Sequence, residues 1–153
     1  MKINEIINIK SIVLDLEVDS KADLLAKMVE FASYSGKVND VNAVLKAVNE
    51  REKIMSTGVG KSIALPHAKT HNVSEPVGSL AILKEPLDYD SLDGEPIRIV
   101  FLLLGQEANV GFHLRVLSKI SRLMNNDSFR YQLLDCRSSK EVLDIFNSME
   151  END

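Results

Sequence analysis

The chain has 153 residues, of which 44% are hydrophobic and 27% are charged, and its formal net charge is −5 at pH 7. These values indicate one globular domain spanning residues 1–153, and they disfavour nucleic-acid binding, which needs a basic face. Cys136 is the single cysteine, so an intramolecular disulfide is excluded. No apolar run is long enough to insert in a membrane, and the stretch MKINEIINIK lacks the apolar core of a signal peptide. We therefore expect a cytoplasmic protein.

The first part of the chain predicts one strand followed by two helices. Ser11–Leu16 is typical of a short strand. Ser20 resembles the first residue of a capping box, and the helix that follows it ends near Gly36. A second helix begins at Asn39 or Asp40. The apolar stripes of the two helices are Leu24, Leu25, Met28, Val29 and Ala32, and then Val41, Val44, Leu45 and Val48.

The rest of the chain predicts strands and then helices. The expected strands are Ser62–Pro66, Val77–Lys84 and Ile97–Leu104, and the last is so apolar that both its faces are expected to be buried. Asn109 and Ser138 each begin a helix, and a short helix lies between them within NNDSFRYQLLDC. The apolar stripes are Val116, Leu117, Ile120, Leu123 and Met124, and then Val142, Ile145, Phe146 and Met149. The expected fold is a single α/β domain with a central mixed β-sheet and helices packed on its faces.

The segment GVGKS resembles part of a nucleotide-binding phosphate loop. The full motif requires a glycine at the position that Met55 occupies. A predicted helix precedes the segment and a predicted strand follows it, which is the reverse of the order that brings a helix N-terminus to a phosphate. We therefore interpret Gly58 and Gly60 as residues that allow a tight turn and close backbone approach.

The chain contains three histidines, of which two are candidate functional residues. His67 follows Pro66 at the end of a predicted strand, and its imidazole is a suitable nucleophile near pH 7. His113 precedes Leu117 and Ile120 at helical spacing, so it is expected to point inward beside a helix N-terminus that opposes protonation. The alternatives are a histidine that closes a strand with a hydrogen bond and a core histidine with its polar atoms satisfied.

The third histidine raises the question of a metal site. His71 lies four residues after His67, a spacing that on a helix suits zinc. The surrounding PHAKTHNVSEP follows a strand and lacks a helical apolar stripe, so we expect His71 in an exposed loop and no metal ion.

Two segments resemble a known family. EKIMSTGVGKSIALPHA, from Glu52 to Ala68, is similar to the active-site signature of type-2 IIA domains of the bacterial sugar phosphotransferase system, a group that includes fructose- and mannitol-class and nitrogen-regulatory IIA proteins. FHLRVLSKISRLM resembles the family's second histidine helix. The resemblance implies that His67 accepts a phosphoryl group on Nε2 from the phosphocarrier HPr and passes it to a IIB domain. It implies neither a cofactor nor membrane insertion, although association with a membrane permease is compatible with it.

The resemblance also implies roles for residues near His67. Arg51 supplies positive charge or orders the pocket, and His113 donates a hydrogen bond to a phosphoryl oxygen. Weaker candidates either contact the same oxygens or brace the loop, and they are Ser56, Thr57 and Gly58. Glu52 stays outside the expected site, because adjacent helical residues do not share a face. We expect His67 in a shallow depression with an apolar rim and a few acidic residues.

Two alternatives to a sugar-transport relay stay open. The same chemistry serves a nitrogen-regulatory IIA protein whose phosphorylation state controls partner proteins. A binding module of the same fold that is not phosphorylated is the other alternative, because a fold does not fix a function.

Overall fold

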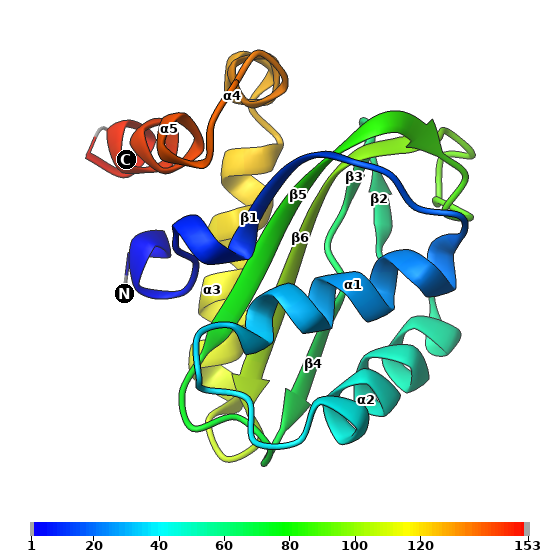
Figure 1. The fold of residues 1–153 in the computed structure, drawn as a ribbon, viewed down its shortest axis with the longest axis vertical. Coiled ribbons are helices and arrows are strands. Elements are labelled where there is room, and N and C mark those ends of the chain that lie inside the picture. Colours follow the sequence, from blue (N-terminus) through cyan, green and yellow to red (C-terminus); the bar gives the residue numbers. More distant parts are fainter. Residues whose placement is uncertain (1, 152–153) are drawn as a thin grey trace.

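A six-stranded mixed sheet forms the centre of the molecule, and helices cover both its faces (Figure 1). The computed structural model describes residues 2–151. The strands are β1 (Ile12–Leu16), β2 (Gly58–Gly60), β3 (Ile63–Ala64), β4 (His67–Thr70), β5 (Val77–Leu87) and β6 (Ile97–Gln106). The helices are α1 (Lys21–Ser33), α2 (Val41–Ile54), α3 (Val110–Met124), α4 (Asp127–Leu134) and α5 (Ser139–Glu151), with the 3-10 helices η1 (Ile3–Glu5) and η2 (Ile9–Ser11). The predicted fold class is confirmed.

Strand β6 organises the sheet. It pairs antiparallel with β5 along one edge and parallel with β3 and then β4 along the other. β1 extends the sheet beyond β5 in parallel, and β2 extends it beyond β3 in antiparallel orientation. All residues of β6 from Ile99 to Gly105 are buried, as the apolar run predicted.

The alternating side chains of β6 enter two separate cores. Helices α1 and α2 cover one face of the sheet, whereas α3 lies behind the other (Figure 1). Residues of α4, α5 and η1 complete the core on the α3 side. The side chains of β6 that face α3 are Ile99, Phe101 and Leu103, and those that face α1 and α2 are Val100, Leu102 and Leu104.

Polar caps fix the helix starts. The side chain of Ser20 accepts the N–H of Asp23 at the start of α1, and that of Asn109 accepts the N–H of Phe112 at the start of α3. Ser138 accepts the N–H of Glu141 in the same way. Of the helices in residues 2–151, none combines the length and apolarity that crossing a bilayer requires.

The fold differs from the sequence prediction at the amino-terminal segment and around His67, among other places. The isoleucines of the amino-terminal segment, Ile3, Ile6 and Ile7, are buried in the α3-side core although no apolar stripe marks them. The strand predicted over Ser62–Pro66 pairs with β6 only at Ile63–Ala64, and pairing resumes at His67 in unchanged register. His67 therefore begins β4, whereas the prediction placed it at the end of a strand.

The interruption before His67 has a local cause. Pro66 has no N–H to donate, although its carbonyl still accepts the N–H of Leu103. The N–H of Leu65 points to the other side, where it donates to the carbonyl of Thr57 at 2.9 Å. The loop that precedes β2 therefore holds the residue that precedes the proline.

Replacing Phe146 by alanine should destabilise the protein by about 3–5 kcal/mol, because the site is fully buried and leaves a cavity. The Phe146 ring packs edge-on against Phe129, with centroids 5.0 Å apart, and against Phe101 at 6.1 Å. Urea denaturation measures the loss. The matched control is Tyr131→Ala at a 66% exposed position, which should change stability by no more than about 0.5 kcal/mol. A loss below about 1 kcal/mol for Phe146→Ala would contradict this packing.

Candidate functional site

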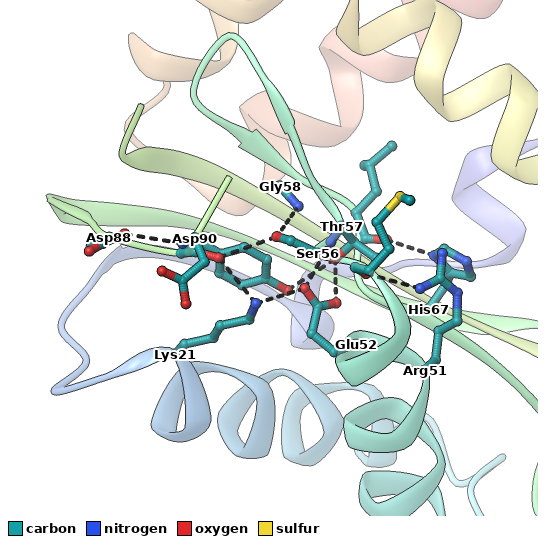
Figure 2. Close-up of polar contacts among 12 residues, drawn as sticks. Lys21, Arg51, Glu52, Ser56, Thr57, Gly58, His67, Asp88 and Asp90 are labelled. Atoms are coloured by element: carbon teal, nitrogen blue, oxygen red, sulfur yellow. Dashed lines mark hydrogen bonds and ion pairs between the residues drawn. The ribbon is translucent and has the colours of Figure 1, made fainter. Parts of the chain in front are cut away.

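The ring of His67 has one nitrogen committed to the backbone. Its Nδ1 lies 2.8 Å from the carbonyl oxygen of Leu65 (Figure 2). A carbonyl only accepts hydrogen bonds, so Nδ1 carries the proton and Nε2 keeps its lone pair. Burial lowers the pKa of His67, the bond to Leu65 acts in the opposite direction, and the charge of Arg51 lowers it again. His67 is therefore a half-buried, neutral imidazole at pH 7 with Nε2 available as a nucleophile.

His113 faces the ring of His67 from the first turn of α3. The two ring centroids are 5.7 Å apart, and the rings are tilted by 49°. His113 is only 3% exposed, as its spacing from Leu117 and Ile120 predicted. A Cβ on residue 105 would lie 2.1 Å from His113 Nδ1, so Gly105 of β6 allows the ring to sit against the sheet.

Neither nitrogen of the His113 ring has a hydrogen-bond partner, although both are buried. Leaving a buried polar group unpaired costs about 1–3 kcal/mol, so the ring is suited to a ligand that pairs with it. Burial, followed by the charges of His67 and Lys69, lowers the pKa of His113 to about 4. The helix N-terminus predicted this direction, but burial is the larger cause.

Arg51 and both histidines line one cavity of about 470 Å³. Arg51 lies in the last turn of α2, where its Nη1 donates to the carbonyl of Met55 at 3.0 Å (Figure 2). Two apolar residues of the cavity wall are largely exposed, Ile54 at 79% and Leu114 at 59%. The other lining residues are Ala47, Glu50, Ala68, Lys69 and Leu117.

Lys69 is a residue of this cavity that the sequence prediction omitted. It follows His67 by two positions on β4, so strand alternation places both side chains on one face. Its positive charge lowers the pKa of His67 and of His113. An anion in the cavity would therefore meet the charges of Lys69 and Arg51.

Glu52 is a second residue that the prediction excluded, and it turns inward. Its carboxylate accepts the N–H of Thr57 at 2.8 Å and the hydroxyl of Thr57 at 2.6 Å, and it pairs with Lys21 at 2.9 Å (Figure 2). The signal for this orientation was present, because Glu52 continues the spacing of the buried residues Val44 and Val48.

The loop candidates Ser56, Thr57 and Gly58 are engaged with the protein itself. The Thr57 hydroxyl is buried and also lies 3.1 Å from the hydroxyl of Tyr89. The Ser56 hydroxyl donates to the Tyr89 carbonyl and accepts the N–H of Gly58. A Cβ on Gly58 would come within 2.9 Å of Ser91 Cα. These contacts favour the bracing role over direct contact with a ligand.

The GVGKS segment forms a hairpin between β2 and β3. Gly60 pairs with Ile63, so only Lys61 and Ser62 lie in the turn. Their φ angles are 58° and 66°, and that of Gly60 is 106°. Such positive values are typical of tight two-residue hairpin turns. The segment is therefore a tight turn, as interpreted from the order of elements.

His71 lies apart from the other histidines at the end of β4. Its side chain is 82% exposed, and its Nδ1 is 3.5 Å from a carboxylate oxygen of Glu107. Residues 2–151 contain no group of three or more His, Cys, Asp or Glu side chains arranged to hold a metal ion.

Burial of His113 predicts a loss of stability in acid. Its pKa is about 4 in the folded protein and 6.5 ordinarily, so the unfolded chain binds more protons between these values. Stability is fully present above pH 6.5 and falls as the pH approaches 4, by on the order of 3 kcal/mol from this group. Urea denaturation at several pH values measures it, with His113→Leu as the reference that lacks the titration. A constant stability difference between the two proteins would contradict a buried, neutral His113.

The sequence relationships agree with this architecture. Residues 5–149 match the protein family described as "Phosphoenolpyruvate-dependent sugar phosphotransferase system, EIIA 2". The chain is 38% identical over 147 residues to the fructose-specific EIIABC component of Bacillus subtilis, covering 96% of this chain but 23% of that protein. It is 36% identical to the fructose-specific EIIA component of Haloferax volcanii, with 82% of each chain covered.

A solved structure extends the relationship. The nitrogen regulatory protein IIA-Ntr from Neisseria meningitidis superposes with a TM-score of 0.88 at 34% sequence identity. The alignment covers 94% of this chain and 98% of that protein. The chain therefore belongs to the type-2 EIIA family of the phosphoenolpyruvate-dependent sugar phosphotransferase system, whose members are components of a phosphoryl-transfer relay.

Proposed function

We propose that the chain, as one IIA domain over residues 1–153, carries a phosphoryl group on Nε2 of His67. It receives the group from HPr and passes it to a IIB domain, for uptake of a fructose- or mannitol-class sugar. The observation that carries the proposal is the 2.8 Å contact between His67 Nδ1 and the carbonyl of Leu65, because it leaves the Nε2 lone pair as the nucleophile.

The transfer exchanges one phosphorus–nitrogen bond for another. Nε2 of His67 attacks the phosphorus of phospho-HPr, the bond to the donor imidazole breaks, and the electron pair of that bond returns to the donor ring. The proton on His67 Nδ1 stays in place, so the phosphorylated ring carries positive charge beside the Leu65 carbonyl. A positively charged ring is a good leaving group, so the bond breaks readily when a nucleophile of the IIB domain attacks the phosphorus.

The surrounding side chains supply charge and hydrogen bonds to the phosphoryl oxygens. Arg51 lines the same cavity as His67 and provides a fixed positive charge. His113 is neutral at pH 7, so one of its two unpaired ring nitrogens carries a proton that it can donate. The exposed apolar residues Ile54 and Leu114 lie at the cavity and suit a transient protein interface.

A regulatory output is the second candidate function. The nitrogen regulatory protein of Neisseria meningitidis matches this chain along nearly its whole length at 34% identity, which is close to the identity of the fructose-specific relatives. The two outputs share the phosphohistidine and differ in the acceptor. Transfer from the phosphorylated chain to a purified sugar-permease IIB domain supports transport, whereas a partner captured from the native host in one phosphorylation state alone supports regulation.

His67→Ala should abolish phosphorylation of the chain. The assay incubates the protein with Enzyme I, HPr and radiolabelled phosphoenolpyruvate, and the expected label on the wild type is labile to acid, as a phosphorus–nitrogen bond is. His71→Ala is the matched control, because its side chain is 82% exposed and lies outside the cavity, so its labelling should equal that of the wild type. A wild type without label would favour the non-phosphorylated binding module.

His113→Ala should still be labelled but should pass the group on slowly. Loss of one hydrogen-bond donor to a transition-state oxygen slows such steps by roughly 100-fold. Rapid-quench measurement of transfer from the phosphorylated variant to a IIB domain gives the rate. A rate equal to that of the wild type would show that His113 has no part in the transfer.

A further inference from the structure

The carboxylate of Glu52, near the end of α2, is buried and makes several polar contacts. Its side chain is only 5% exposed. It accepts two hydrogen bonds from Thr57 and forms an ion pair with Lys21. Burying a charge carries a desolvation cost that such contacts only partly offset. Stability alone is therefore a weak reason for a carboxylate at this position.

A short series of hydrogen bonds connects Glu52 to the ring of His67. Glu52 holds the N–H and hydroxyl of Thr57. The carbonyl of Thr57 accepts the N–H of Leu65 at 2.9 Å, and the carbonyl of Leu65 faces His67 Nδ1 at 2.8 Å (Figure 2). The N–H and the carbonyl of Thr57, and likewise those of Leu65, belong to neighbouring peptide groups of one residue, so each contact restrains the residue that makes the next one.

The Leu65 backbone lies outside the regular pairing of the strands. It lies in the interruption between β3 and β4, where neither Leu65 nor Pro66 belongs to a strand. The bond from the Leu65 N–H to Thr57 is its backbone link to the loop after α2, while its side chain is buried in the α3-side core and the carbonyl of Pro66 accepts the N–H of Leu103. A shift of the Thr57 loop would move the Leu65 carbonyl away from His67. The ring would then lose the acceptor that favours a proton on Nδ1.

We propose that Glu52 is a positioning residue for His67, which acts through Thr57 and Leu65 to keep the proton on Nδ1 and the lone pair on Nε2. Without this restraint the neutral ring populates the tautomer protonated on Nε2, which is the form that prevails for histidine in water. That tautomer has no Nε2 lone pair and cannot attack phosphorus. The use of Nε2 rests on the proposed function, whereas the tautomer is a property of the unphosphorylated protein.

Nitrogen-15 NMR of the imidazole side chains at neutral pH reports the tautomer directly. The three histidines of the chain give few signals, and His67→Ala identifies those of His67. In the wild type we expect His67 protonated on Nδ1. Glu52→Gln keeps the side chain's size and removes its charge, and it should give a mixture with a clear Nε2-protonated fraction.

Glu150 provides a matched control. Its side chain is 2% exposed, it pairs with Lys119, and it accepts the N–H of Ile3 at 3.0 Å. It lies in α5, at the opposite end of the molecule from α2 (Figure 1). Glu150→Gln therefore removes a comparable buried charge, and it should leave the His67 tautomer as in the wild type. An equal change of tautomer in both variants would overturn the proposal, since it would mean a general loss of order.

Variants at Thr57 test the connection independently of Glu52 and of its effect on folding. Thr57→Val removes the hydroxyl that donates a hydrogen bond to Glu52. It should increase the Nε2-protonated fraction of His67, as Glu52→Gln should. Thr57→Ser keeps the hydroxyl and should restore the wild-type spectrum. If Thr57→Val and folded Glu52→Gln both keep His67 fully protonated on Nδ1, the proposal is overturned.

A kinetic measurement links the tautomer to the transfer. Phosphorylation of Glu52→Gln by phospho-HPr in a single turnover should be roughly 10-fold slower than that of the wild type. Losses of this size are typical of residues that orient a functional side chain through hydrogen bonds without contacting the bound group themselves. Glu150→Gln should react at the wild-type rate. A wild type that takes no phosphate would overturn the proposed function, and the tautomer measurement would still decide the role of Glu52.

Discussion

The hydrogen bond between His67 Nδ1 and the carbonyl of Leu65 is the contact on which the candidate site depends. It exists because the chain between β3 and β4 leaves the strand at Pro66 while keeping its register on β6. In an uninterrupted strand, the carbonyl of Leu65 would point toward a neighbouring strand, and it would not face the imidazole of His67. The interruption thus turns a backbone carbonyl into the group that sets the protonation of the ring.

The two histidines of the cavity are held neutral, and the proposed function gives each a different role. Burial lowers the pKa of both rings, the charge of Arg51 lowers that of His67 further, and the charge of Lys69 lowers both. In the proposed relay, a neutral His67 is the nucleophile and a neutral His113 is a donor to the phosphoryl oxygens. The buried ring nitrogens of His113 have no hydrogen-bond partner in the protein, so in the proposed relay a phosphoryl group would gain contacts on entering the cavity. Since the group would also have to leave again, a site of few contacts suits a carrier better than a deep anion pocket.

The sequence predicted most of the fold because the helices carry caps and apolar stripes and β6 is almost wholly apolar. It placed His113 in the interior correctly from the spacing to Leu117 and Ile120. It missed β4, because HAKT is short and polar and its pairing depends on the distant β6. Lys69 was missed with that strand. Tyr89 is fully buried in the segment between β5 and β6, where no local pattern marks a core residue.

The end of α2 shows why the site could not be read fully from single residues. Adjacent positions on a helix diverge by about 100°, so Arg51 and Glu52 enter different surroundings. Arg51 lines the cavity and holds the Met55 carbonyl, whereas Glu52 holds Thr57 from the interior. The loop after α2 is thereby fixed at two points, at Met55 beside the cavity and at Thr57 in the protein interior. The geometry of His67 thus depends on the backbone of this loop, which Arg51 and Glu52 hold, and their charges also act directly on the pKa of the ring, Arg51 lowering it and Glu52 raising it.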